Sequence, residues 1–419
     1  MTDERTMSMR MRALAAAALA TGMLAACGGG SDSGSGDKQT VTMWTYPVIA
    51  DQAKHQAFWD EQTAAFEKAN PSIDVKVEIY PWAKRDEALS TAIAGNKAPD
   101  VVYLIPDQLP KYAKTLQPVD EYLSAEAKAD YRDNAKASVT IDGKMMGAPI
   151  LMTSNPLVCN KKAFDAAGVT TYPTTWDELL ELAPTFKDKG IDVTNHWADP
   201  AATLNQSFYP LLWQAGGDVF TPDGKKTAFA GPEGIKALTF LRKLVDGGYV
   251  EKDLLTGLPK FEQTHVAQNK VACTWQHVPA DVATFWGEEN IKVFPPLKDV
   301  KQVAYGTVGS LAMFKAADDK EAAGKWLAFA TRPEATKAYD TASNNFSPQK
   351  STGSLYASDP VQGEMEKTLD LTTAGPLNEK ARDVMGVLAP EIQAALIGKK
   401  TPEQALADAA AAADALLGG

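Results

Sequence analysis

Aromatic side chains stand at the ends of several predicted strands, next to polar groups. Trp44 and Tyr46 close a first alternating stretch, Trp82 follows a second, and Trp275 and His277 close a later one. Flat rings pack against the apolar C–H faces of a pyranose, while Asp, Asn, Gln, Arg and His bond the hydroxyls around its rim. A hydrogen bond to a charged group contributes about 1.5–3 kcal/mol, so a few such groups can orient a ligand. The pattern therefore predicts a site for a sugar-like ring.

Strands that alternate with helices must position these side chains. The expected elements are strands 41–46, 75–79 and 98–105 and helices of about 51–69 and 83–94. This alternation predicts a parallel sheet whose strands bind ligand at their carboxyl ends. Asp107 and Gln108 directly follow the third strand, so they join Trp44, Tyr46 and Trp82 at the same edge.

A structural role is the alternative for each candidate. Trp59 and Trp326 lie at helical spacing and are expected in the core, and Trp176 is expected to pack at a helix start. We expect only about half of the strand-end aromatics to touch ligand. His277 could equally be a buried, hydrogen-bonded histidine, and Arg382 a surface ion pair.

The stretch from residue 143 to 190 carries an ordered series of local signals. Pro149 interrupts the apolar run 145–152, which favours a strand at a sheet edge or at a crossing between two bodies. A short strand, 156–160, then leads into a helix, 161–167, that ends at Gly168. The residues Thr175 to Glu178 form a capping box, which predicts the start of another helix.

This order of motifs resembles the crossover segment of family 1 extracellular solute-binding proteins, the sugar-binding subunits of ABC importers. The matching stretches read GKMMGAP, LVCNKKAFDAAG and PTTWDEL, and the C-terminal ALIGKKTPEQALADA is close to the end of the family's pattern. Cys159 stands where the family usually has Tyr. The resemblance covers residues 40 to 417, and it rests on the series of motifs because each motif alone is common.

The resemblance implies an α/β fold of the two-lobe periplasmic-binding-protein type II (Venus-flytrap) class with three inter-lobe crossings. The first lobe is expected over 38–149 and 309–347, and the second over 150–308 and 348–419. The second and third crossings are expected at 305–310 and 344–348. Ligand would bind between the lobes and stabilise their closed arrangement.

The resemblance also adds site residues to those at the strand ends. Gln206 lies where maltose-binding proteins place a stacking Tyr, and Phe208 or Tyr209 could supply the ring instead. Arg382 and Met385 fall where family members contact ligand from the second lobe. The predicted ligand-binding set is Trp44, Tyr46, Trp82, Asp107, Gln108, Gln206, Trp275, His277 and Arg382.

The N-terminus predicts export and a lipid anchor. Residues 1–26 combine basic Arg5, Arg10 and Arg12 with a short apolar core, as in a lipoprotein signal peptide. Leu24 to Cys27 matches a lipobox, so Cys27 is the expected lipidation site on the outer face of the cell membrane. Residues 27–37 continue as a Gly/Ser linker. Removing residues 1–26 removes three basic and two acidic residues, so the net charge changes from −11 to −12, which argues against nucleic acid as a partner.

The remaining reactive side chains do not form a recognisable catalytic or metal motif. The four histidines are scattered, and no Gly-x-Ser-x-Gly, P-loop, Gly-x-Gly-x-x-Gly or Cys-x₂-Cys pattern occurs. We therefore expect no enzyme activity, no metal and no cofactor. Outside the cytoplasm Cys159 and Cys273 could pair. We expect two buried free thiols, because nothing in the sequence brings them together.

The sequence thus predicts a monomeric lipoprotein that carries a mono- or oligosaccharide to the permease subunits of an ABC importer. The same fold could instead bind another solute, such as a polyol, a glycerophosphodiester or a polyamine. A secreted carbohydrate-active enzyme would need two carboxylates about 5–10 Å apart. A lipoprotein sensor that signals on closure is the remaining alternative.

Overall fold

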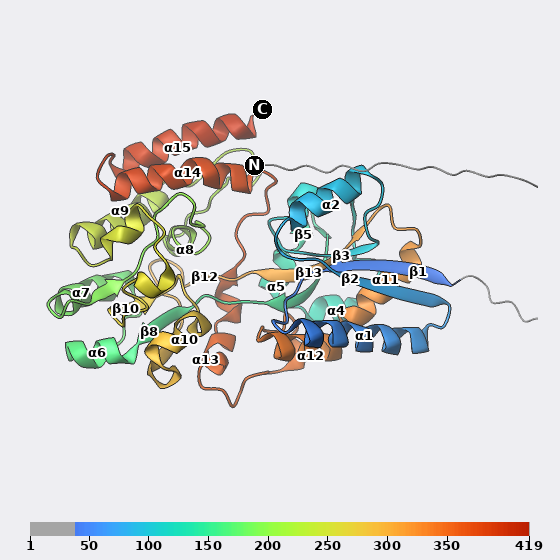
Figure 1. Cartoon of the computed structure of the whole chain (residues 1–419). Helices are drawn as coiled ribbons and strands as arrows, with labels where there is room; N and C mark the ends of the chain where they lie inside the picture. Colours follow the sequence, from blue (N-terminus) through green and yellow to red (C-terminus); the bar gives the residue numbers. More distant parts are fainter. Residues whose placement is uncertain (1–37, 419) are drawn as a thin grey trace, which may run out of the picture. The chain divides into compact units, whose positions relative to one another are not determined.

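The computed structural model describes residues 38–418 (Figure 1). Residues 38–419 form one compact unit. The predicted signal peptide 1–26, Cys27 and the linker 27–37 lie outside the described residues. Within 38–418, no helix is both long enough and apolar enough to cross a membrane.

The first lobe is built on a six-stranded sheet. Its strand order is β2-β1-β3-β13-β4, and β7 also pairs with β13. The first elements are β1 Gln39–Thr45, α1 Gln52–Ala69, β2 Ile73–Ile79, α2 Arg85–Ala94 and β3 Val101–Leu104. β1 pairs in parallel with both β2 and β3, which confirms the parallel arrangement predicted for them. Their carboxyl ends therefore share one edge.

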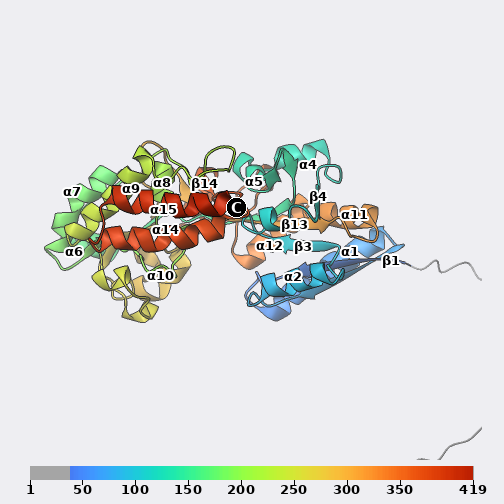
Figure 2. The same cartoon turned by 90° about the horizontal axis from the view of Figure 1, so that it is seen from above.

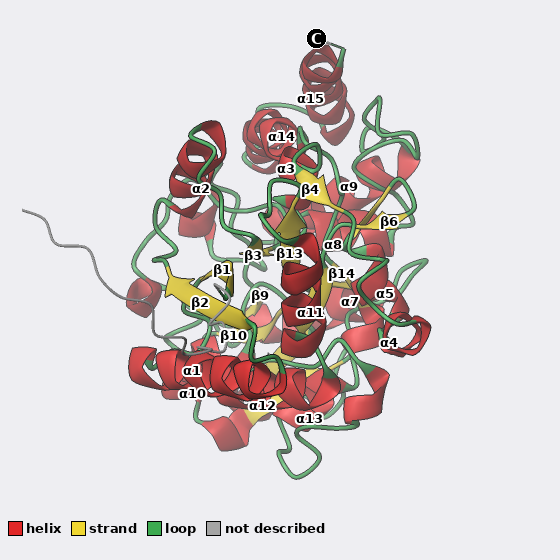
Figure 3. Cartoon of the chain, turned by 90° about the vertical axis from the view of Figure 1, so that its right-hand side faces the viewer, coloured by secondary structure: helices red, strands yellow, loops and turns green. Residues whose placement is uncertain are grey.

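Helices cover both faces of this sheet. α1 and α12 lie on one side and α2 on the other (Figures 1 and 3). Asp51 caps α1 by accepting hydrogen bonds from the backbone N–H groups of Ala53 and Lys54. α1 directs the fully buried Trp59 towards Trp326, with ring centroids 6.3 Å apart, so both are core residues as predicted.

Short elements complete this lobe. They are α3 Leu109–Tyr112, β4 Leu116–Gln117, α4 Ala125–Asp130, α5 Asp133–Ala137, β5 Thr140–Ile141, β6 Lys144–Met145, α11 Lys320–Ala330 and α12 Pro333–Ser343.

The second lobe is built on a four-stranded sheet of order β11-β8-β10-β9. Its strands are β8 Leu157–Asn160, β9 Asp192–Thr194, β10 Val271–Thr274 and β11 Ile291–Phe294. Two helix-end signals predicted from the sequence are confirmed in this lobe. α6 Lys161–Ala167 ends at Gly168 with φ 69°, and Thr175 and Glu178 form the capping box of α7 Trp176–Lys187. The lobe also contains α8 Tyr209–Gln214, α9 Pro232–Asp246, α10 Pro279–Trp286 and the 3₁₀ turns Lys252–Leu255, Phe261–Gln263 and Glu288–Asn290.

Cys159 and Cys273 form a disulfide bond with an S–S distance of 2.01 Å. They lie directly opposite each other on the antiparallel strands β8 and β10, with Cα atoms 4.0 Å apart. The expectation of two free thiols was therefore wrong. The pairing depends on the register of two strands that are 114 residues apart in sequence, and local sequence signals do not fix that register.

The chain passes between the lobes three times, as predicted. β7 Ala148–Met152 leads into β8, β11 leads back through β12 Ala304–Tyr305 to β13 Val308–Phe314, and the chain leaves the first lobe again after α12. Gly309 in β13 faces Tyr103, and a Cβ atom there would lie 2.2 Å from the phenol oxygen. Only glycine fits this position. Ser351 still bonds Asp130, so contacts with the first lobe continue past α12.

Two long helices close the chain. α14 Ala381–Leu396 and α15 Pro402–Leu417 pack against each other and on α9 (Figures 1 and 2). α14 contains Pro390 in its interior. The buried residues Val384 and Leu388 extend the apolar stripe upstream, which outweighs the hydrogen bond that the proline removes. Before α14 lie 3₁₀ turns Lys350–Thr352 and Leu369–Leu371, α13 Gln362–Glu366 and β14 Thr372–Thr373.

Candidate functional site

An ion pair joins the two lobes at the N-terminal turn of α14. The Nε of Arg382 donates to Oδ2 of Asp107 at 2.9 Å, and its Nη2 bonds the same oxygen. Asp107 belongs to the loop after β3. The Nη1 of Arg382 also lies 3.5 Å from Oδ2 of Asp86, in the first turn of α2. One guanidinium of the second lobe therefore spans two carboxylates of the first.

The side chain of Gln108 connects Asp86 to the backbone of the loop after β3. Its side chain is 2 % exposed, and its Nε2 donates to Oδ1 of Asp86 at 2.5 Å. Its Oε1 accepts the backbone N–H of Ile105 at 3.2 Å. Burial tends to lower the pKa of Arg382, but its hydrogen bonds to Asp107 and the charge of that carboxylate raise the pKa overall. Arg382 therefore carries its positive charge at neutral pH.

Aromatic rings lie beside the ion pair. Tyr46 and Trp82 stack with centroids 5.0 Å apart, and the guanidinium of Arg85 lies 5.3 Å above the indole of Trp82. The indole N–H donates to the carbonyl of Pro47 at 3.1 Å, which fixes the ring. Trp82 is 40 % exposed and Tyr46 only 1 %. The indole is therefore held in place while part of its surface stays open to solvent.

Two buried polar atoms at this place have no partner among the described residues, the hydroxyl of Tyr46 and Oδ1 of Asp107. Burial raises the pKa of Tyr46 to about 12, with further effects from Arg85 and Asp86. The phenol is therefore a neutral hydrogen-bond donor. Buried polar groups are almost always paired, so a donor and an acceptor without partners point to a bound molecule.

Five predicted residues thus come together with two that sequence reasoning missed. We call this set the inter-lobe cluster: Tyr46, Trp82, Arg85, Asp86, Asp107, Gln108 and Arg382. Arg85 and Asp86 were missed although they follow Trp82 within four residues. Their position between the end of β2 and the start of α2 could have indicated that they belong to the site.

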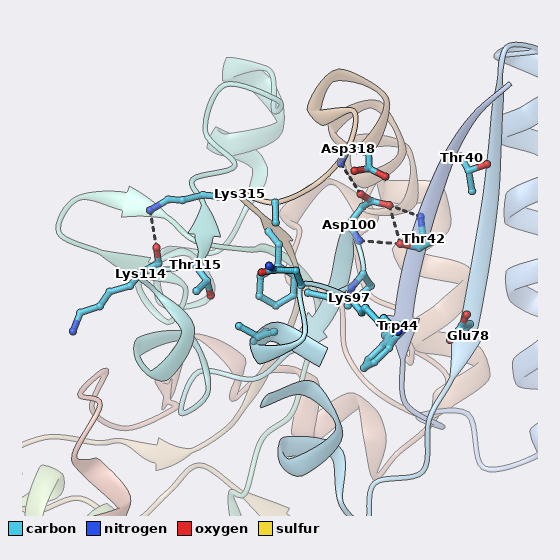
Figure 4. Close-up of a pocket in the computed structure, with 16 residues that line it drawn as sticks. Thr40, Thr42, Trp44, Glu78, Lys97, Asp100, Lys114, Thr115, Lys315 and Asp318 are labelled. Atoms are coloured by element: carbon cyan, nitrogen blue, oxygen red, sulfur yellow. Dashed lines mark hydrogen bonds between the residues drawn. The ribbon is translucent and has the colours of Figure 1, made fainter. Parts of the chain in front are cut away.

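Trp44 lies apart from the inter-lobe cluster. Its ring packs on Tyr80, with centroids 4.1 Å apart, and lines a hollow of about 660 Å³ with Thr42, Lys97 and Asp100 (Figure 4). Asp100 accepts the backbone N–H of Thr42 at 2.7 Å and its hydroxyl at 2.8 Å, which ties the strand to the loop before β3. The wall of this hollow is therefore built by the first lobe alone.

Gln206 and His277 line a separate pocket of about 440 Å³, which we call the second-lobe pocket. Its other lining residues are Trp197, Ala202, Thr203, Ser207, Phe261, Gln276 and Asp281. Trp275 lies behind it, 5 % exposed, and donates its indole N–H to the carbonyl of Ser207 at 3.4 Å. Trp275 therefore supports the pocket from the core and offers no open ring face.

One contact links this pocket to α14. The hydroxyl of Thr203 lies 3.8 Å from the sulfur of Met385, one turn after Arg382 on α14. Burial raises the pKa of Tyr305, and the charge of Asp107 adds to this rise. The pocket therefore lies next to the helix that carries Arg382. Across residues 38–418, no three His, Cys, Asp or Glu side chains are grouped to hold a metal.

Comparison with known proteins agrees with this architecture. The model of the family described as bacterial extracellular solute-binding protein matches residues 50–337. A Brucella abortus protein named as a binding protein is 24 % identical over 87 % of this chain and 91 % of its own length. The diacetylchitobiose binding protein DasA of Streptomyces coelicolor is 31 % identical over 52 % of each chain.

Solved structures give the same fold. The cyclic α-maltosyl-1,6-maltose binding protein of Arthrobacter globiformis superposes with a TM-score of 0.79 at 21 % identity, covering 91 % of this chain and 99 % of that one. The sugar-binding protein MalE of Xanthomonas citri gives 0.78 at 21 % identity, covering 91 % and 98 %. These superpositions confirm the two-lobe α/β fold. With the family match over most of its length, the chain belongs to the bacterial extracellular solute-binding proteins.

Proposed function

We propose that this protein is the substrate-binding lipoprotein of an ABC importer, which captures a carbohydrate between its lobes and delivers it to a membrane permease. The observation that carries the proposal is the inter-lobe cluster, where Arg382 of one lobe meets Asp107 and Asp86 of the other beside an exposed indole. Charged planar groups next to a fixed aromatic face are the chemistry that a sugar ring requires.

The cluster supplies each kind of contact. The exposed face of Trp82 takes the C–H face of a ring, and the phenol of Tyr46 donates to a hydroxyl oxygen. Oδ1 of Asp107 accepts from a hydroxyl, while the guanidinium of Arg382 donates to its neighbour. A ligand that satisfies groups of both lobes binds the closed form more tightly than the open one, so it shifts the population towards closure.

The names of relatives support a carbohydrate cargo. One is named as a diacetylchitobiose binding protein and another, from Pyrococcus abyssi and 26 % identical over 41 % of this chain, as a maltotriose-binding protein. We extend this class of ligand to the present chain because the inter-lobe cluster has the matching chemistry.

Export and anchoring belong to the same proposal. Residues 1–26 would direct export, Cys27 would carry the lipid, and residues 27–37 would tether a monomeric body to the outer face of the cell membrane. The proposed lobes are 38–149 with 309–347 and 150–308 with 348–419. The strands β7 and β13, which pair with each other, support these limits because each lies at one of the crossings.

The two carboxylates favour a second candidate cargo, a polyamine. Asp86 and Asp107 would bind an ammonium group if the guanidinium of Arg382 moved away from them. The carbohydrate is preferred because the bridge already neutralises both carboxylates, and because Arg85 adds a second cation beside Trp82.

Thermal unfolding of residues 38–419 against mono- and oligosaccharides, polyols, glycerophosphodiesters and polyamines tests the proposal. A ligand that binds only the folded state stabilises it by about 2.7 kcal/mol at 100 times its Kd. We expect a raised midpoint with one saccharide series and no product after long incubation. A shift only with a polyamine, polyol or phosphodiester would overturn the carbohydrate assignment, and release of shorter sugars would show an enzyme.

A further inference from the structure

We propose that one edge of the first-lobe sheet rests on the anionic lipid headgroups of the membrane to which the protein is anchored. This edge contains the amino ends of β1, β2, β3 and β4 and the carboxyl end of β13, because β1 pairs in parallel with β2 and β3 while β13 is antiparallel to β3 and β4. We call it the amino-end edge. The inference rests on the proposed anchoring through Cys27, and it assigns the anchored protein a membrane-facing surface.

Lysines lie on each of five chain segments that enter or leave the sheet at this edge. Their side chains are all exposed, and none forms an ion pair within residues 38–418. These edge lysines are Lys38 before β1, Lys68 before β2, Lys97 before β3, Lys114 before β4, and Lys315 and Lys320 after β13. The start of β1 lies next to α11, which Lys320 begins (Figure 1). Exposed ammonium groups along one edge form a surface that fits a negatively charged partner.

The fold holds three of the edge lysines close together. Lys97, Lys114 and Lys315 line one hollow together with Thr40 of β1 (Figure 4). The ammonium group of Lys315 donates to the carbonyl oxygen of Lys114 at 2.9 Å. Like charges gathered in this way repel one another, so an anionic headgroup that enters between them lowers their electrostatic energy.

The carboxylates of the same edge are mostly occupied by other partners. Those that bond a backbone N–H or a lysine are Glu67, Asp100, Asp319 and Glu321. Asp100 is only 8 % exposed, and Glu321 is neutralised by Lys325 at 2.8 Å. The two carboxylates without such a bond are those of Asp74 and Asp318. The outermost charge of this edge is therefore mainly positive, although the chain as a whole is acidic.

The place of the lipid anchor makes a membrane the partner of this surface. Ten residues, 28–37, separate Cys27 from Lys38, which lies at the amino-end edge. A chain of ten residues spans at most about 33–36 Å, so this edge stays near the bilayer that holds the anchor. Near an anionic leaflet each lysine strengthens binding about five-fold. Charges farther than about 10 Å away are largely screened at about 0.1 M salt, so this edge outweighs the acidic remainder of the chain.

This orientation keeps the inter-lobe cluster open to the outer solution. Tyr46 and Asp107 follow the opposite ends of β1 and β3. β1 has seven residues, so the two edges of the sheet lie roughly 20 Å apart at about 3.3 Å per residue. Cargo therefore reaches the cluster from the side of the lobe that faces away from the bilayer.

Sedimentation of residues 38–419 with lipid vesicles tests the inference. The vesicles contain phosphatidylcholine alone or with about 30 % phosphatidylglycerol, an anionic lipid. At about 0.1 M salt we expect at least ten-fold tighter association with the anionic vesicles, and we expect the difference to vanish at about 1 M, where the screening length is roughly 3 Å. Equal association with both vesicles at low salt would overturn the inference.

The same protein keeps this result apart from the proposed function. It lacks Cys27, so its association with vesicles does not depend on lipidation. Saccharide titration of the same protein reports cargo binding separately. Loss of vesicle association with intact saccharide binding would therefore overturn the membrane-facing surface alone.

Matched variants locate the surface. The triple variant Lys97→Gln, Lys114→Gln, Lys315→Gln should prefer anionic over neutral vesicles by no more than about two-fold, since each lysine contributes about five-fold. The control variant Lys225→Gln, Lys226→Gln, Lys301→Gln removes three exposed lysines of the second lobe and should keep the wild-type preference. All six side chains are exposed, so both variants should fold, which thermal unfolding verifies. An unchanged preference in the first variant, or an equal loss in both, would contradict the assignment.

Discussion

Arg382 on α14 bonds Asp107 through both Nε and Nη2, although 275 residues separate them in sequence. The contact joins the two lobes directly. More than half of the Arg382 side chain is exposed, whereas that of Asp107 is about a quarter exposed. The pair therefore acts less as a source of stability than as a link whose strength depends on salt and on whatever enters between the lobes.

Arg382→Gln should open the ligand-free protein. Loss of the guanidinium removes the bonds from α14 to Asp107 and Asp86, and it leaves Asp107 without an ion-pair partner among residues 38–418. The radius of gyration measured by X-ray scattering should rise, and the wild type should approach the same value as salt increases from about 0.1 to 1 M, where the screening length falls from roughly 10 to 3 Å.

Lys380→Gln is the matched control for that experiment. Lys380 carries the same charge two residues earlier, but its amine lies 3.6 Å from Asp383 on its own helix. It should leave the scattering curve unchanged. Equal opening in the two variants would mean that general charge, and not the bridge, holds the lobes together.

The Cys159–Cys273 bond should stabilise the second lobe. It closes a loop of 114 residues, for which chain entropy predicts about 4–5 kcal/mol, and measured values for disulfides are commonly about 2–4 kcal/mol. The double variant Cys159→Ser, Cys273→Ser should lose that much in denaturant unfolding. Reductant should destabilise the wild type and leave the variant unaffected. A variant as stable as the wild type would contradict a structural role for the bond.

Local signals made much of the fold predictable. Gly168 and the capping box of Thr175 and Glu178 mark helix ends through contacts within four residues. Such helix ends can be predicted without knowing the tertiary structure. The alternation from β1 to β3 was equally visible. Pro390 is tolerated inside α14 because the buried residues Val384 and Leu388 anchor the helix before it, and local signals do not show that burial.

The candidate site was predictable only in part, because it depends on contacts between distant segments. The strand-end position of Tyr46 and Asp107 could be inferred, but not that Arg382 would meet both Asp107 and Asp86. Trp275 and Trp82 both follow the end of a strand. Packing nevertheless buries the ring of Trp275 and leaves that of Trp82 exposed. Whether a strand-end aromatic faces the core or a ligand is decided by tertiary packing.

Asp340 should make stability fall with rising pH. Its carboxyl group is fully buried, neither oxygen has a partner among the described residues, and burial raises its pKa well above the usual value. The folded state therefore holds a proton that the unfolded chain releases near pH 4. The stabilisation is complete below that pH and is lost as pH rises towards the folded pKa.

Asp340→Asn should remove this dependence. The amide cannot ionise, so at pH 8 the variant avoids the cost of keeping the buried carboxyl protonated. Its free energy of unfolding should then exceed that of the wild type by about 1.4 kcal/mol for each pKa unit between the unfolded value and the lower of pH 8 and the folded value. The comparison is thermal unfolding at pH 5 and pH 8. Asp188→Asn, which changes an exposed carboxylate, should keep the wild-type slope. A lower stability of Asp340→Asn at both pH values would show that the carboxyl makes a specific contact.

Trp82→Ala and Trp44→Ala should separate the two places where strand-end aromatics lie. Trp82 stacks on Tyr46 beside the Arg382 bridge, whereas Trp44 packs on Tyr80 and lines the hollow of the first lobe (Figure 4). Removing the indole of Trp82 deletes the apolar surface proposed to contact a sugar ring. Contacts between aromatic rings contribute about 0.5–1.5 kcal/mol beyond area burial. Trp82→Ala should therefore weaken saccharide binding about ten-fold by calorimetry. Trp44→Ala should change it less than two-fold, and a greater loss with Trp44→Ala than with Trp82→Ala would move the site to that hollow.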